Sequence, residues 1–424
     1  MNTARRRPLL LAAMLIDTLG GGLLTPFELI YALQIMHLSL PTAGAILSVA
    51  AAAGIAVGPV AGAAVDRIGP TRIAALANAF GAAGCVSLLF WTTAAGYALA
   101  SFLITVHMRA FWGAFTPLVS SIAEAHELEK WFGRLRSARF IGLASGEGLS
   151  GLAFIGGQQT GLRLLVVADG ISYLVTLALL LLAGRGVRTR SAHAAEEPAF
   201  GDGEQARPGY RAALADRVNL AFAALNVAAT LLLIAPVLAL PVFALERLHL
   251  ATWVPGLMAG LMTTAAATGS LFSIRLVRGR RRLRNLQIAA ALWALSFGVF
   301  LFAPLGSAIA LISLFTGALL LGLGEAFYAP TADAIPAALA PVHLQGRYAA
   351  IHQMAWGISE TIAPALVAAA LATGSDTLWV ILAAIAVATI AAYRLLEGPS
   401  GGRDGVAGLE AATAAPSAQL VEVV

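Results

Sequence analysis

The sequence is dominated by long apolar stretches that alternate with short polar segments. Twelve of these stretches approach or exceed the roughly 20 residues that cross a bilayer as a helix. They cover residues 8–33, 41–64, 72–92, 95–120, 138–158, 163–184, 217–241, 252–277, 286–305, 307–330, 347–372 and 376–396. A membrane β-barrel has short segments of alternating polarity instead of continuous apolar runs. The predicted fold class is therefore all-α, a polytopic membrane protein with twelve transmembrane helices.

Charged residues are too few for a soluble protein. They make up 12% of the chain, whereas an average soluble domain carries about 25%. Hydrophobic residues make up 59%, which is more than a soluble core can enclose. The sequence shows no nucleophile–base pair, metal pair or soluble sensory domain, so neither an enzyme nor a cofactor is predicted. His107 and His352 have no second ligand spaced with them and are interpreted as helix-packing residues, not metal ligands.

Basic residues fall mainly on one side of the predicted topology. Of the 27 lysines and arginines, Arg109 lies inside a span, and only Arg163 and Arg247 lie on the side opposite the termini. Because positive residues stay in the cytoplasm, both termini are predicted to be cytoplasmic, with the chain in the cell (inner) membrane. The arginine cluster at 275–284 carries the same topology signal, so no nucleic-acid partner is predicted. Arginine outnumbers lysine 26 to 1, which favours a bacterial source.

The longest internal polar stretch, 185–216, divides the spans into two sets of six. It contains glycine, proline and charged residues without an apolar period, which is typical of a flexible linker. The predicted domains are an N-terminal six-helix bundle (1–184), a cytoplasmic linker (185–216), a C-terminal six-helix bundle (217–396) and a disordered cytoplasmic tail (397–424). Two such bundles are typical of transporters that rock about a midplane site, and a monomer is expected.

Three short patterns limit the chemistry further. A phosphate-binding loop needs Gly-Lys followed by Ser or Thr, and the single lysine, Lys130, lies between Glu129 and Trp131. ATP hydrolysis by this chain is therefore not predicted. The G-x-G-x-x-G run at 146–151 lies inside a predicted span with no strand before it, so it is interpreted as helix-packing glycines. The only cysteine, Cys85, lies in mid-span, which excludes an internal disulfide and a thiolate metal site.

The loop after the second span has the sequence Gly62-Ala-Ala-Val-Asp66-Arg67-Ile-Gly69-Pro-Thr-Arg72. It resembles the signature loop of the major facilitator superfamily, G-x-x-x-D-R-x-G-R/K-R/K, from which Pro70 and Thr71 depart. Together with spans split six and six, the resemblance implies the transporter fold of that superfamily. An acid beside a base at a helix end can pair with a neighbouring helix in one conformation and release it in another. The loop is therefore predicted to gate the conformational change, with a plain cytoplasmic turn as the alternative.

Two more segments resemble elements of the same superfamily. Arg109-Ala-Phe-Trp-Gly113 resembles its R-x-x-x-G element in the fourth span. An arginine inside a span is costly unless it is paired or hydrated, so Arg109 is expected to face the cavity. The run from Gly322 through Glu325 to Pro330, followed by Ala340-Pro-Val-His-Leu-Gln-Gly-Arg-Tyr348, is similar to a pattern of bacterial drug and metabolite exporters. Glutamine stands at position 345, where that pattern usually has arginine.

The fifth span departs from the pattern of antiporters in the superfamily, G-x-x-x-G-P-x-x-G-G. Gly148, Gly156 and Gly157 fit the spacing, but Leu-Ala at 152–153 replaces the central Gly-Pro. The span therefore keeps a small face without the kink, and this departure weakens the exporter interpretation. These three glycines and Gly113 are predicted to let helices pack closely.

Acidic residues inside the spans are the predicted proton-coupling groups, because a buried carboxyl group can hold and exchange a proton near neutral pH. Asp17 and Glu28 share one face of the first span. The other intramembrane acids are Glu147, Asp169, Glu325 and Glu360. In the superfamily, spans 1, 4, 7 and 10 line the cavity, which implies that Asp17, Arg109 and Glu325 converge there. For each acid, a structural hydrogen bond between helices is the alternative.

These features favour proton-coupled efflux of a small amphipathic compound, either a drug or a secondary metabolite. An importer or facilitator of a small metabolite is the alternative. Sugar importers usually line the cavity with many amide and tryptophan side chains, and these spans offer few, notably Asn78, Asn226, Gln353 and Trp356. The predicted partners are therefore a small-molecule substrate, protons as the coupling ion, and the lipid bilayer.

The asymmetry of the basic residues gives a direct test of topology. Reporter fusions at the C-terminus and within 185–209 are expected to report a cytoplasmic location, because the arginines gather on that side. Fusions at Arg163 and Arg247 are expected to report the opposite side. A cytoplasmic signal at either of these two positions contradicts the predicted topology.

Overall fold

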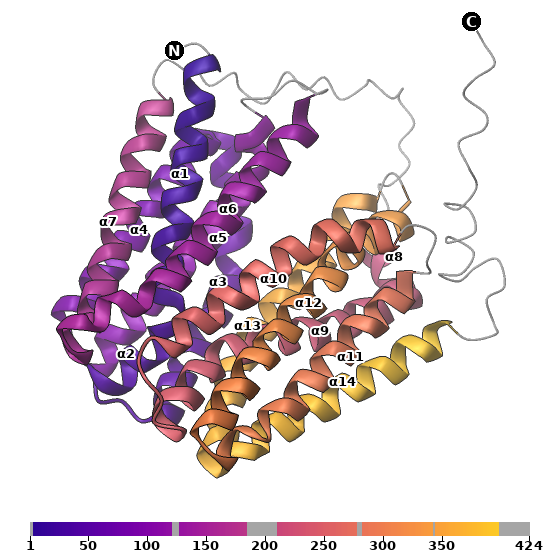
Figure 1. The fold of residues 1–424 in the computed structure, drawn as a ribbon. Coiled ribbons are helices and arrows are strands. Elements are labelled where there is room, and N and C mark those ends of the chain that lie inside the picture. The colour runs from indigo at the N-terminus through magenta and orange to yellow at the C-terminus, as the bar shows by residue number, and fades with distance from the viewer. Residues whose placement is uncertain (1–2, 121–126, 185–209, 278–281, 342–343, 398–424) are drawn as a thin grey trace, which may run out of the picture. The chain divides into compact units, whose positions relative to one another are not determined.

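The computed structural model describes residues 3–120, 127–184, 210–277, 282–341 and 344–397. Within these ranges the chain forms helices and no strands (Figure 1), which confirms the all-α prediction. The α-helices are α1 (Thr3–Leu24), α2 (Glu28–Gln34), α3 (Leu40–Ile68), α4 (Pro70–Phe90), α5 (Ala94–Ser120), α6 (Leu128–Ser150), α7 (Gln158–Gly184), α8 (Tyr210–Ala215), α9 (Arg217–Val242), α10 (Val254–Val277), α11 (Arg282–Phe300), α12 (Ser307–Leu339), α13 (Gln345–Thr373) and α14 (Ser375–Glu397).

Ten helical segments of the described chain are long and apolar enough to cross a membrane. The other two long helices, α6 and α10, contain 23 and 24 residues and lie where the fifth and eighth spans are predicted. Helix α6 begins at Leu128, ten residues before the predicted span at 138. Its first turns carry Lys130, Arg134 and Arg136, and these charges lower the hydropathy of this part of the helix below that of a span. A polytopic helical architecture therefore holds, with element boundaries that shift by up to ten residues.

The chain groups into two compact units. Unit 1 comprises Met1–Gln205, Ile234–Thr264 and Glu360–Leu378, and unit 2 comprises Ala206–Leu233, Ala265–Ser359 and Trp379–Val424. Parts of α9, α10 and α13 therefore belong to the same unit as the N-terminal helices. Most of the predicted linker (185–209) and nearly all of the predicted tail (398–424) lie outside the described residues, while the end of the linker forms α8. The predicted domain boundaries stay a prediction.

Glycines bring the helices of unit 1 into close contact. Helix α1 packs along α6, and a Cβ built on Gly146 would lie 2.1 Å from the carbonyl oxygen of Leu19. A Cβ on Gly142 would similarly lie 2.3 Å from the hydroxyl of Thr18. Small residues let helix backbones approach in a membrane, where apolar burial alone gives little association. The helix-packing interpretation of the first glycine of the 146–151 run is therefore confirmed.

Polar contacts also attach the later segments of unit 1 to its N-terminal helices. The Gln34 side-chain amide donates to Glu246 Oε1 at 2.7 Å, and the Arg247 guanidinium donates to the carbonyl oxygen of Leu371 at 2.6 Å. The backbone N–H of Ala365 donates to Ser48 Oγ at 3.1 Å. These contacts tie the end of α9 and the second half of α13 to α2 and α3, so unit 1 is held by hydrogen bonds as well as by packing.

A backbone turn at the end of the first span occurs again 212 residues later. The hydrogen-bonded residues Gln34 and Glu246 are separated by the same number of residues. The backbone N–H of Met36 bonds to the carbonyl of Tyr31, and that of Leu248 bonds to the carbonyl of Phe243. The residue that follows each donor, His37 or His249, has a positive φ of 54° or 50°. The same backbone turn at the same interval indicates two related halves, as expected for a pseudo-symmetric pair of bundles.

In unit 2, helices α11 and α12 pack together through polar and aromatic contacts. Trp293 Nε1 donates to the carbonyl oxygen of Leu321 at 3.2 Å, and a Cβ on Gly324 would lie 2.3 Å from that indole nitrogen. The Tyr328 hydroxyl donates to Asn226 Oδ1 at 2.5 Å, which joins α12 to α9. The side chains of Trp293, Tyr328 and Asn226 thus have hydrogen-bond partners in the apolar interior, as burial of polar groups demands.

The contrast between two glycines of α6 tests this packing. Replacing Gly146 by alanine is expected to destabilise the protein by about 1–3 kcal/mol, because its Cβ would overlap the backbone of α1. Gly148→Ala is the matched control, since a Cβ there meets no atom within 4 Å. Thermal unfolding of the purified variants in detergent measures the difference. Equal melting temperatures for both variants would contradict the close approach of α1 and α6.

Candidate functional site

An ion pair joins Arg109 in α5 to Glu360 in α13, both within unit 1. The Arg109 guanidinium donates from Nη2 to Glu360 Oε2, and the two side chains are 22% and 32% exposed. The sequence nominated each residue as a coupling or cavity group but did not predict that they contact each other. A paired arginine is the arrangement that an apolar span tolerates, so the expectation that Arg109 needs a partner is met by Glu360.

The sequence of α3 positions this pair. Gly54 lies against α5, where a Cβ would be 2.2 Å from Thr105 Cγ2 and 3.7 Å from Arg109 Cγ. Gly44 lies against α13, where a Cβ would be 2.6 Å from the carbonyl oxygen of Pro364. Helix α3 therefore packs closely on both α5 and α13 through glycines, and this packing brings the guanidinium and the carboxylate within reach of each other.

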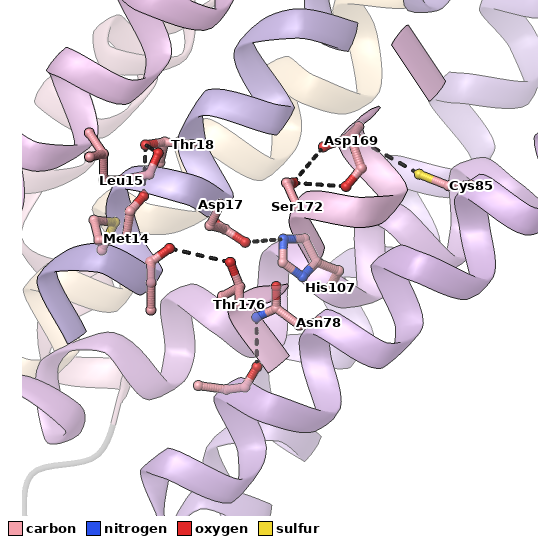
Figure 2. Close-up of polar contacts among 12 residues, drawn as sticks. Met14, Leu15, Asp17, Thr18, Asn78, Cys85, His107, Asp169, Ser172 and Thr176 are labelled. Atoms are coloured by element: carbon pink, nitrogen blue, oxygen red, sulfur yellow. Dashed lines mark hydrogen bonds and ion pairs between the residues drawn. The ribbon is translucent and has the colours of Figure 1, made fainter. Parts of the chain in front are cut away.

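A second polar group lies among α1, α4, α5 and α7 (Figure 2). Asp17 Oδ1 lies 3.9 Å from His107 Nε2. Asp169 accepts from Ser172 Oγ at 3.4 Å and from Cys85 Sγ at 3.7 Å. All five side chains are buried, with Asp17, His107 and Asp169 at 8%, 4% and 2% exposure. Two acids, one histidine and one thiol thus share an apolar interior.

Aromatic side chains fix the imidazole ring of His107. Its ring is 4.5 Å from that of Tyr173 in an edge-on arrangement and 5.8 Å from that of Phe111 in a stacked one. The packing role predicted for His107 is thus present, and so is a facing carboxylate that the prediction missed. The sequence signal for this contact was the position of His107, a polar residue inside the apolar stretch 95–120. His352, in contrast, packs beside Phe222 with ring centroids 5.0 Å apart.

The other predicted coupling acids occupy separate places. Glu325 is half-buried in α12 of unit 2, whereas Asp17 and Arg109 belong to unit 1. The predicted convergence of these three residues therefore stays a prediction. Glu147 is buried in α6, where its carbonyl oxygen accepts from Ser150 Oγ at 2.6 Å. Across the described ranges of the chain, no group of three His, Cys, Asp or Glu side chains is placed to hold a metal ion.

The predicted gating loop forms the turn between α3 and α4. Gly69 has a φ of 91°, a conformation that favours glycine, and it separates the two helices. The charged side chains of the loop are exposed, namely Asp66, Arg67 and Arg72. No ion pair links them to any described residue. A Cβ on Gly62 would meet no atom within 4 Å, so this glycine of the signature loop makes no close helix contact.

The glycines predicted to pack helices differ in their surroundings. A Cβ on Gly113 or Gly148 would meet no atom within 4 Å, and one on Gly156 would meet only Thr160, at 3.8 Å. Gly157 has a φ of 102° and serves the turn before α7. Gly148 contributes through its backbone, which a Cβ on Gly260 would approach at 3.2 Å. Gly142 and Gly146 of the same helix make closer contacts, on the face of α6 that meets α1.

The chain resembles known proteins both in sequence and in fold. The sequence profile of the Major Facilitator Superfamily matches residues 10–319. A search of curated protein sequences gives no match. Among solved structures, the nucleoside transporter NupG superposes with a TM-score of 0.72 at 13% identity, covering 93% of this chain and 99% of its own.

Two further structures have the same fold. A POT family transporter in complex with 5-aminolevulinic acid has a TM-score of 0.74 at 12% identity, covering 92% of this chain and 96% of its own. A bacterial homologue of the iron transporter ferroportin in an inward-facing state has a TM-score of 0.70 at 14% identity, covering 93% and 99%. At such low identity, these likenesses show a shared fold.

Exchanging the charges of Arg109 and Glu360 tests their pairing. Arg109→Glu and Glu360→Arg are each expected to destabilise the protein by about 1–3 kcal/mol, less than for a fully buried pair because both side chains are partly exposed. The double exchange restores opposite charges and is expected to recover part of the loss. Thermal unfolding of the four proteins measures this coupling, with Arg394→Glu, an exposed arginine in α14, as the control. Purely additive losses contradict the ion pair.

Proposed function

We propose, from the premise that this chain belongs to the major facilitator superfamily, that it is a proton-coupled transporter that moves a small amphipathic compound out of the cell. Family membership and the fold indicate a transporter, not an enzyme, in a membrane that the chain crosses many times. The coupling ion, the direction of transport and the class of substrate are the proposed parts. The observation that carries the proposal is the set of buried carboxylates in apolar helices.

Energetics favours a proton as the coupling ion. An ionised carboxylate in an apolar helix bundle is costly, whereas its protonated form is tolerated. Asp17 and Asp169 lie together, buried in unit 1, with no lysine or arginine bonded to either carboxylate in the described part of the chain. Each of them is therefore stabilised by gaining a proton, and a change of environment during transport releases it. Glu325 in α12 is proposed as the corresponding acid of the second half.

The Arg109–Glu360 pair supplies a second element that protonation can switch. A proton on Glu360 removes the negative charge that holds the guanidinium, and it leaves Arg109 free to interact elsewhere. Removing one partner of a desolvated pair is strongly unfavourable, so the guanidinium then needs a new anion or water. We assign Arg109 the tuning of the coupling acids and Glu360 the role of its exchangeable partner.

Sequence patterns support export. The runs from Gly322 to Pro330 and from Ala340 to Tyr348 resemble those of bacterial drug and metabolite exporters, and the spans carry few amide side chains to bind a polar metabolite. Import of a small metabolite is the second candidate, favoured by the likeness of the fold to the solved structures of a nucleoside transporter and of a POT family transporter. In either case we place the protein in the inner membrane as a monomer, with both termini in the cytoplasm.

The exposed loop between α3 and α4 is proposed to act in conformational change and not in binding. Asp66 and Arg67 are both exposed and lie in the last turn of α3, whereas Asp17 and Asp169 are buried in other helices. A charge pair at such a helix end contributes to whichever conformation brings it near a neighbour. We infer that the loop sets the balance between inward-facing and outward-facing states.

Amide variants of the coupling acids test the proposal. Asp17→Asn and Glu325→Gln preserve shape but cannot bind and release a proton, so they are expected to abolish pH-gradient-driven transport while the protein still folds. Resistance of whole cells to a panel of amphipathic toxic compounds identifies a transported compound. Its movement is then measured in proteoliposomes with and without an imposed pH gradient.

The matched control is Asp376→Asn, an exposed acid at the start of α14, which is expected to transport normally. The contrary result is accumulation of the compound against its gradient by the double amide variant when the pH gradient is applied. In that case Asp17 and Glu325 are structural, and Glu147 and Glu360 become the coupling candidates.

A further inference from the structure

Asp17 and His107 face each other across a gap that ordinary packing does not explain. Their atoms Oδ1 and Nε2 are 3.9 Å apart, and the side chains are 9% and 5% exposed. This separation is too long for a hydrogen bond but short enough for strong attraction between opposite charges. Asp17 Oδ1 has no hydrogen-bond partner in the part of the chain that the structure describes, whereas the His107 imidazole also interacts with the backbone of Ala77. Buried polar atoms are nearly always satisfied, so Asp17 Oδ1 needs a partner.

The neighbouring ionisable groups leave His107 as the group that can balance Asp17. Asp169 of α7 already accepts from Ser172 and from Cys85 of α4. Tyr173 of α7 presents its ring to the imidazole. The guanidinium of Arg109, two residues along α5 from His107, is bonded to Glu360. The remaining acids on neighbouring elements are Glu28 of α2 and Glu147 of α6, and neither supplies a positive charge.

We propose that His107 is the proton acceptor of Asp17, and that the two side chains form one proton-exchange pair inside the N-terminal helices. This inference rests on the proposed function in giving Asp17 a proton to exchange. In the step, the O–H bond of the Asp17 carboxyl group breaks and the lone pair on His107 Nε2 takes the proton. The products are a carboxylate and an imidazolium, and the net charge of the pair is zero before and after.

The exchange explains how an apolar interior can contain a proton that moves. A lone carboxylate among these helices is costly, whereas a carboxylate beside an imidazolium is stabilised by their attraction in a low dielectric. Figure 2 shows the two side chains pointing toward each other from α1 and α5. Protonation can therefore pass between helices without creating an unpaired charge.

The geometry also makes the step depend on helix position. Hydrogen-bond distance for this pair is about 2.7–3.2 Å, so the two side chains must approach by about 0.7–1.2 Å from the observed 3.9 Å. Gly20 holds α1 directly against α7, since a Cβ there would lie 1.9 Å from Ser172 Oγ. The rings of Tyr173 and Phe111 hold the imidazole from the other side. A small shift of α1 is thus enough to open or close the proton path.

Spectroscopic titration of the purified full-length protein tests the pair without any substrate. Infrared difference spectra follow the carboxylic C=O band that is absent in Asp17→Asn, and nitrogen NMR follows the imidazolium signal that is absent in His107→Gln. In the wild type, a range of pH is expected in which the C=O band is absent while the imidazolium signal is present, because the single proton of the pair then lies on His107. In His107→Gln, the C=O band is expected to persist across that range. In Asp17→Asn, the His107 imidazolium signal is expected to be lost.

The matched control is His352→Gln, which removes another buried histidine that packs beside an aromatic ring and has no hydrogen-bond partner among the described residues. It is expected to leave both signals unchanged. Asp17→Glu keeps the carboxyl group and lengthens the side chain by one methylene, so it remains informative if an uncharged variant fails to fold. It is expected to keep a pH range in which the C=O band is absent and the imidazolium signal is present. The proposal is overturned if the C=O band titrates unchanged in His107→Gln, if the imidazolium forms in that range without Asp17, or if no such range exists in Asp17→Glu.

This experiment and the transport assay fail independently. If carboxylate and imidazolium coexist as expected but Asp17→Asn still transports under a pH gradient, the pair stands and its proposed coupling role is wrong. If Asp17→Asn loses gradient-driven transport but the wild type has no pH range with both carboxylate and imidazolium, coupling stands and His107 is not the acceptor.

Discussion

The cost of a charge in an apolar helix bundle determines most of this structure. Every ionisable side chain inside a span must carry a proton, meet an opposite charge or bond to the backbone. Unit 1 shows the second and the third of these solutions. Arg109 pairs with Glu360, Asp17 faces His107, and the Arg6 guanidinium donates to the carbonyl oxygen of Ala183 at 2.8 Å. In the proposed function, helix positions are therefore tied to the protonation of a few carboxyl groups.

Close helix packing means that a change at one carboxyl group requires whole helices to move. Glycines at the contacts of α1 with α6 and of α3 with α5 and α13 leave no slack for a side chain, so a carboxyl group and its partner change distance only when whole helices move. Because packed interiors shift between discrete arrangements more readily than they deform, a proton gained or lost at such a contact can favour one arrangement over another. This is the physical basis for linking proton binding to transport.

Several features of the fold could be predicted from the sequence because they depend on local composition. Continuous apolar runs located the long helices, and the alternation of arginine-rich and arginine-poor segments predicted a topology. The start of α6 was misplaced because Lys130 and Arg134 made its first turns look like a loop, although they are helical. Resemblance of short motifs gave the family, which the match over residues 10–319 shows.

The partners of the polar residues could not be predicted, because they depend on which helix faces meet. The need of Arg109 for a counter-charge was clear from its place in a span, but nothing local identifies Glu360 among the available acids. His107 was interpreted as a packing residue because no ligand is spaced with it along the chain, and its carboxylate partner lies on another helix. Similarly, Gly146 and Gly148 are two residues apart and point to different sides of α6, and motif spacing alone could not show that only a Cβ on Gly146 would meet α1.

The central claim is that solute and proton movements are coupled in this protein, and proton flux tests it most directly. Proteoliposomes containing a pH-sensitive dye are given a compound identified by the resistance panel, with no pH gradient imposed beforehand. The account predicts that a gradient of the compound alone changes the lumenal pH, and that this change is absent in Asp17→Asn. Movement of the compound with no change in lumenal pH would contradict it.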